Sequence, residues 1–119
     1  MRSLLFRLAR TRFSKYVIGW IIAHMSFAIP VKRLHETDTL MAFHHPKPSH
    51  KTHILLVPKQ ARHNPGDLSA EDAAFMVDLF ATVNKLVNDL DLEKSGYRLI
   101  CNGGAYQDVP QLHFHLVSG

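Results

Sequence analysis

Residues 111–119 read QLHFHLVSG, and through most of this stretch polar and apolar side chains alternate. Successive side chains of an extended strand point to opposite faces of a sheet, so the alternation predicts a strand over residues 111–117 with two unlike faces. The polar face carries Gln111, His113 and His115, followed by Val117. The other face carries Leu112, Phe114 and Leu116. We expect the apolar set to enter a core and the polar set to line a pocket.

Four further segments upstream have the composition of short strands. They are Val31–His35, Leu40–Phe43, His53–Val57 and Tyr97–Asn102. The third has a continuous apolar run that stops at Pro58, which predicts burial on both of its faces.

One long helix is predicted between the third and fourth of these segments. Ser69 and Asp72 have the spacing of a capping box at its start. An apolar stripe follows over roughly 20 residues at helical periodicity. Its members are Phe75, Leu79, Val83, Leu86, Val87 and Leu90. The sequence therefore predicts an α+β fold, a five-stranded sheet with one long helix packed on one face.

The charge is unevenly distributed along the chain. The net charge is +4, but residues 1–33 hold seven of the 14 Lys and Arg residues and no acid, which leaves residues 34–119 with a net charge of −3. A mildly acidic body argues against specific nucleic-acid binding. We divide the chain into a basic amphipathic helical segment, 1–29, and a domain, 30–119.

The N-terminal segment allows three interpretations. Its apolar run, Tyr16–Val31, is shorter than the roughly 20 residues that span a bilayer, so a transmembrane helix ranks last. A helix lying on a membrane surface and a helix covering the domain core or a subunit interface rank equally. The single cysteine, Cys101, excludes an internal disulfide framework and fits a small buried residue in a reducing compartment. We expect a cytoplasmic protein, with membrane association through residues 1–29 as an open alternative.

The histidines of residues 111–119 also allow three interpretations from spacing alone. They could be catalytically idle. His113 and His115 could bind zinc, with a further ligand from His53, His44 or His45. A neutral imidazole could instead attack phosphorus as a nucleophile, because its ordinary pKa leaves it mostly unprotonated at neutral pH.

Three motifs occur in order along the chain: AFHHPKPSHKTHILLVPK at 42–59, NGG followed by a glutamine at 102–107, and QLHFHLVSG. Together they resemble the histidine triad family of nucleotide hydrolases and transferases, particularly its Hint-type branch, from about Phe27 to Gly119. The resemblance implies an antiparallel sheet and a homodimer that binds purine nucleotides. It also implies cleavage of phosphorus–nitrogen or phosphoanhydride bonds through a nucleotidyl-histidine, without a cofactor or a catalytic metal.

The resemblance assigns roles to individual residues. The nucleophile falls on His113 and the third triad histidine on His115, with His53 supporting the same pocket. The nucleotide-binding positions fall on Phe43, His44 and His45 in the pocket wall and on Asn102, Gln107 and Asp108 in the phosphate-side loop.

The sequence departs from the family pattern at three places. Gln111 stands where the first triad histidine is expected, and glutamine cannot gain or lose a proton near neutral pH. His45 stands where an aspartate usually binds the ribose hydroxyls. The sequence ends at Gly119, so we do not expect the C-terminal specificity tail of the family.

Two functional hypotheses follow. The first is a nucleotide hydrolase or nucleotidyl transferase that works through His113, slowed by Gln111 and His45. The second is a nucleotide-binding module that has lost efficient catalysis and is docked to a membrane or partner by residues 1–29. A zinc site on His113, His115 and His53 ranks last.

Overall fold

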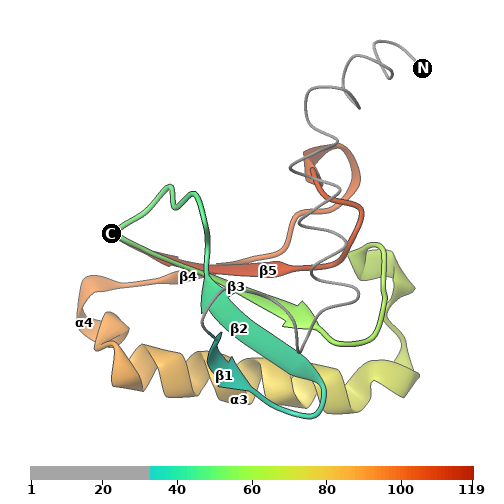
Figure 1. Ribbon diagram of the computed structural model, residues 1–119, viewed down its shortest axis with the longest axis horizontal. Helices are drawn as coiled ribbons and strands as arrows, with labels where there is room; N and C mark the ends of the chain where they lie inside the picture. Colours follow the sequence, from blue (N-terminus) through green and yellow to red (C-terminus); the bar gives the residue numbers. More distant parts are fainter. Residues whose placement is uncertain (1–32) are drawn as a thin grey trace.

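The computed structural model describes residues 33–119, so the helix expected over residues 1–29 lies outside the described residues. The described chain forms a five-stranded antiparallel sheet in the order β1-β2-β3-β5-β4, with one long helix, α3, along one face (Figure 1). The strands are β1 Arg33–Glu36, β2 Leu40–His44, β3 Thr52–Pro58, β4 Arg98–Ile100 and β5 Phe114–Ser118. The α-helices are α3 Ala73–Asp89 and the short α4 Leu92–Ser95. The predicted α+β fold is confirmed.

The core lies between the sheet and α3. The sheet supplies Leu40, Ala42, Ile54, Leu56 and Leu116, and the helix supplies Phe75, Leu79, Val83, Leu86 and Val87. Leu112 and Phe114 pack into the same cluster. The predicted apolar face of the last strand is therefore confirmed.

Helix α3 is shorter than the roughly 20 residues predicted. Its start is a 3-10 turn, η3 (Ala70–Asp72), capped by Ser69, whose backbone N–H donates to the Asp72 carboxylate at 3.0 Å. The helix ends before Asp91, whose φ of 55° places it in the left-handed region and so interrupts helical geometry. Leu90 follows the last helical residue and is 40% exposed, so including it in the buried stripe was wrong.

Strand β5 begins at Phe114, three residues later than predicted. The ladder with β3 pairs Leu56 with Phe114, and two residues further along Leu112 would face Pro58. Proline has no N–H to donate to a ladder, and β3 ends there. The Leu112 N–H instead donates to the Arg62 carbonyl at 2.7 Å.

Strand β3 is buried from His53 to Pro58, as its apolar run predicts. Strand β4 is shorter than its predicted segment and pairs with β5 over three residues, Arg98–Ile100. Within residues 33–119, none of the helices has both the length and the apolar content needed to cross a bilayer.

Candidate active site

Histidine side chains gather on the face of the sheet that points away from α3. His53 in β3 and His115 in β5 both lie on this face, because their strand neighbours Ile54 and Leu116 point into the core with α3. His53 Nε2 and His115 Nδ1 are 2.8 Å apart. The His113 and His115 rings have centroids 4.9 Å apart. His45 stacks on His53 at 4.3 Å.

Hydrogen-bond donors from the loop after β2 determine which nitrogens of His53 and His115 carry protons. The backbone N–H of Ser49 donates to His53 Nδ1 at 3.1 Å. An amide N–H can only donate, so the proton of the neutral His53 ring is on Nε2, which donates to His115 Nδ1. The proton of His115 is then on Nε2. This nitrogen is left as a donor for a bound group.

His113 has the opposite arrangement. Its Nδ1 lies 2.7 Å from the backbone carbonyl oxygen of Gln111. A carbonyl oxygen can only accept, so Nδ1 carries the proton and the neutral ring keeps an unprotonated lone pair on Nε2. Neighbouring imidazoles thus present a nucleophilic nitrogen on His113 and a hydrogen-bond donor on His115.

Burial keeps this cluster neutral. Burial, and to a smaller extent the positive charges that His45 and His50 would carry, lower the pKa of His53 to about 4. Burial also lowers the pKa of His115 to about 4, with smaller contributions from His113, His53 and His45, while the Asp108 carboxylate opposes the shift. The pKa of His45 is lowered chiefly by burial. All three rings are therefore uncharged at neutral pH.

Gln111 contributes its backbone rather than its amide to the observed hydrogen bonds. Its side chain is 5% exposed, and among the described residues its Nε2 has no hydrogen-bond partner. A buried amide nitrogen without a partner is uncommon in folded proteins. The side chain holds a spare donor but no titratable proton.

The predicted pocket-wall residues separate onto the two faces of the sheet. Phe43 is buried in β2 and points to the same face as the histidines. His44 is exposed and follows the alternation of Leu40 and Ala42, which point toward α3. The structure therefore brings Phe43 and His45 to the histidine face and leaves His44 outside it.

The predicted phosphate-side residues lie in the segment between β4 and β5. The Gln107 amide donates to the backbone carbonyls of His63 and Val109, so it holds this segment to the loop after β3. Asp108 is exposed. Asn102 is half-buried and follows the end of β4.

Ser49 and His63 are site-supporting residues that the sequence did not reveal. Ser49 acts through its backbone N–H on His53, and His63 Nδ1 donates to the Pro110 carbonyl at 3.2 Å. The His63 contact joins segments 47 residues apart, and no motif marks a backbone N–H such as that of Ser49 as a donor. Only the fold identifies them.

Three imidazoles suggest a metal site, but their orientation does not suit one. The candidate nitrogens of His45, His53 and His115 lie within 4.8 Å of one another. A metal ion must lie close to the plane of each ring that binds it, whereas the His45 and His53 rings are stacked at 4.3 Å with planes 30° apart. The Nδ1 atoms of these two rings also accept backbone N–H groups from Lys47 and Ser49. The arrangement is a hydrogen-bonded stack of rings.

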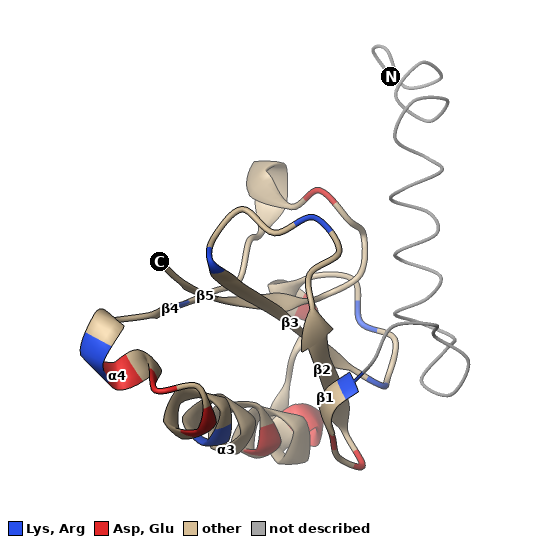
Figure 2. Ribbon diagram, turned by 60° about the vertical axis from the view of Figure 1, so that its left-hand side comes forward, with Lys and Arg blue, Asp and Glu red and all other residues tan. Residues whose placement is uncertain are grey.

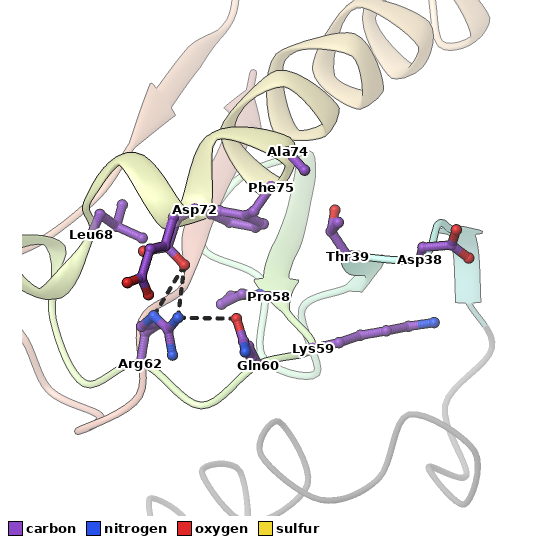
Figure 3. A pocket seen from close by; sticks show the side chains of 11 residues that line it. Asp38, Thr39, Pro58, Lys59, Gln60, Arg62, Leu68, Asp72, Ala74 and Phe75 are labelled. Carbon is purple, nitrogen blue, oxygen red and sulfur yellow. Dashed lines mark hydrogen bonds and ion pairs between the residues drawn. The ribbon is translucent and has the colours of Figure 1, made fainter.

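A separate cavity of about 370 Å³ opens beside the start of α3 (Figure 3). Arg62 donates to the Asp72 carboxylate there at 2.9 and 3.1 Å, and this hydrogen bond lowers the pKa of Asp72. Lys59 pairs with Glu36 at 2.7 Å. Each of these cations already has a carboxylate partner, so we assign this cavity a structural role.

In sequence and in fold, the chain is similar to proteins of one family. Residues 26–119 match the family model described as HIT domain. An uncharacterized 13.2 kDa HIT-like protein of Azospirillum brasilense is 38% identical over 94 residues, 76% of this chain and 77% of the relative. A HIT family hydrolase from Clostridium thermocellum superposes with a TM-score of 0.75 at 31% identity, covering 87% of this chain and 89% of that one. A histidine triad nucleotide-binding protein from Candida albicans superposes with a TM-score of 0.70 at 28% identity, covering 84% of this chain and 71% of that one.

Proposed function

The chain belongs to the HIT domain family, and on this premise we propose that it is a nucleotide hydrolase or nucleotidyl transferase of the Hint-type branch. Its nucleophile is His113. The observation that carries the proposal is the 2.7 Å hydrogen bond from His113 Nδ1 to the Gln111 carbonyl, because it leaves the Nε2 lone pair free. Relatives described as a hydrolase and as a nucleotide-binding protein support the same class.

The proposed reaction has two steps. In the first, His113 Nε2 attacks the α-phosphorus of a purine nucleoside phosphoramidate or related nucleotide. A nitrogen–phosphorus bond forms, and the bond to the leaving group breaks. The leaving group departs with the bonding electrons and takes up a proton from solvent. In the second step water attacks phosphorus and the nitrogen–phosphorus bond breaks, with its electrons returning to His113 Nε2. The attacking water releases one proton to solvent, which leaves the nucleoside monophosphate and the neutral His113 ring.

The neighbouring groups stabilise the charge that develops in these steps. When Nε2 bonds to phosphorus the His113 ring becomes positive, and the Gln111 carbonyl that accepts from Nδ1 stabilises that charge. The Nε2–H of His115 is the donor for a phosphoryl oxygen, and His53 maintains it through the 2.8 Å hydrogen bond. Gln111 stands at the first triad position and orients His113 without transferring a proton.

We also propose a homodimer. Among the described strands β4 pairs only with β5, so its second edge has unpaired backbone groups that a second copy of the chain can bind. The exposed ring of Tyr97 immediately precedes this strand. Membrane contact through residues 1–29 stays a hypothesis outside the described part of the chain.

The test is intact-protein mass spectrometry after brief mixing with an adenosine phosphoramidate, quenched without acid because phosphorus–nitrogen bonds are acid-labile. We expect an added adenylyl mass on the natural protein and none on His113→Gln. We also expect at least a thousandfold loss of turnover in that variant. His35→Gln, a histidine of β1 outside the cluster, is the matched control.

The outcomes separate the two functional hypotheses. Retained turnover in His113→Gln would overturn the assignment of the nucleophile. Tight nucleotide binding without adduct or product, across several nucleotide substrates, would favour the binding module.

A further inference from the structure

His45 joins the histidine cluster through one backbone hydrogen bond and a ring stack. Its N–H donates to the His53 carbonyl at 2.8 Å, which continues the β2–β3 pairing by one residue. Its ring stacks on His53 at 4.3 Å and lies 6.0 Å from the His115 ring. His45 is therefore held beside the groups that would bind the reacting phosphate.

The loop after β2 also determines what His45 can bind. The backbone N–H of Lys47 donates to His45 Nδ1 at 2.9 Å. The proton of the neutral ring is then on Nε2, and Nδ1 has no lone pair left for a ligand. Towards a substrate His45 is a donor only. It can bond an acceptor oxygen, but it cannot accept from a hydroxyl group.

The loop that follows His45 is basic, which favours an anionic acceptor, and the Asp108 carboxylate acts on His115 of the same cluster. No aspartate or glutamate occurs from residue 39 to residue 66, whereas Lys47 and Lys51 lie in the loop between β2 and β3. Figure 2 shows the same loop with basic segments and no acidic ones. A phosphoryl oxygen is both an acceptor and an anion, so it satisfies both the His45 donor and the loop charge.

We infer that His45 makes this site select nucleotides that carry a second phosphoryl group near the reacting phosphorus, over nucleotides that offer only ribose hydroxyls there. The inference rests on the proposed function and names the substrate class of the same site. The second phosphoryl group has two possible sources: a phosphate on the ribose, or the next phosphate of a polyphosphate chain. Both present the same acceptor oxygens, and the test distinguishes them.

The experiment measures dissociation constants by calorimetry on the full chain. Four ligands are compared: AMP, 2′,3′-dideoxy-AMP, ADP and adenosine 3′,5′-bisphosphate. We expect ADP or the bisphosphate to bind about tenfold more tightly than AMP, since a hydrogen bond to a charged acceptor has that magnitude. Whichever of the two is favoured identifies the source of the phosphoryl group. Loss of the ribose hydroxyls should change AMP affinity by less than about threefold.

Variants of His45 separate its hydrogen bond from its other contacts. His45→Phe keeps a ring to stack on His53 and removes the N–H, so we expect the preference for the second phosphate to fall by about fivefold or more. His45→Asp supplies an acceptor with a negative charge. It should reverse the selectivity, so that AMP binds more tightly than both the dideoxy nucleotide and the bisphosphate. His35→Phe is the matched control away from the cluster.

Lys47→Ala tests whether the loop charge alone explains the preference, because it keeps the backbone N–H that sets the His45 proton. We expect it to retain more of the preference than His45→Phe does. If His45→Phe keeps the full preference, or if AMP binds more than about tenfold more tightly than its dideoxy form, the inference is overturned.

The adduct experiment separates failure of this inference from failure of the proposed function. If an adenylyl adduct forms on His113 but the four ligands bind without the expected selectivity, only the inference about His45 is overturned. Selective binding without an adduct or turnover removes the catalytic proposal and leaves the inference supported for the binding site. If none of the nucleotides binds, both are overturned.

Discussion

The two faces of the sheet differ most sharply at adjacent residues of β5. Leu116 is fully buried against α3, within a cluster of aliphatic and aromatic side chains. His115 points to the other face and is half-buried among imidazoles, where burial lowers its pKa to about 4. At Leu116 the packing excludes water and stabilises the fold. At His115 it keeps polar rings neutral and hydrogen-bonded, which is the condition for imidazole chemistry on phosphorus.

The largest effect we expect from this comparison is on stability. Leu116→Ala removes a buried side chain from the core and should lower the free energy of unfolding by about 3 kcal/mol. His115→Ala, one residue away on the other face, should change it by about 1 kcal/mol or less and reduce turnover about a hundredfold. Urea denaturation and steady-state kinetics measure the two effects. Similar losses of stability in the two variants would contradict the claim that Leu116 stabilises the fold while His115 serves the site.

A second prediction concerns the ion pairs on the α3 side. Arg62→Met leaves the buried Asp72 carboxylate without its cation, and we expect the melting temperature to fall by roughly 5–10 °C. Lys85→Met removes the same kind of pair with Asp89, but there both side chains are about half exposed, at 50% and 54%. Water already screens such a pair, so its loss should change the melting temperature by no more than about 2 °C. Equal shifts in a thermal unfolding assay would show that burial of the Arg62 pair has no energetic consequence.

A third prediction concerns the pH dependence of stability. The pKa of His53 and of His115 is about 4 in the fold, below the ordinary value of 6.5, so the unfolded chain binds more protons between these values. Stability from the neutral rings is complete above pH 6.5 and is lost as the pH falls towards 4. We expect the free energy of unfolding to decrease from pH 7 to pH 5 by at most about 2 kcal/mol for each of the two rings.

The His53→Gln variant is the control for this pH effect. It replaces one of the two titrating rings with a neutral side chain, so its stability should depend less on pH over the same range. The same slope in His53→Gln and the natural protein would rule out His53 as a source of the effect.

Much of the fold was predictable because local patterns agreed with the tertiary packing. The apolar positions Leu112, Phe114 and Leu116 entered the core as their alternation predicts, and the Ser69–Asp72 capping box is present before α3. The start of β5 was not predictable from its own residues, because it depends on Pro58 in the neighbouring strand. The true helix end at Asp89 was also missed, since an apolar residue just beyond it continued the stripe.

For residues 112–116 the sequence by itself determined which side chains face the core and which face the opposite side of the sheet. Only the tertiary structure decided what each histidine can do. The proton positions on His53 and His45 depend on backbone N–H groups of Ser49 and Lys47, and that on His113 depends on a backbone carbonyl. The residue type determines that an imidazole nitrogen can either donate or accept a hydrogen bond. Which of the two it does depends on the donor or acceptor that the fold places next to it.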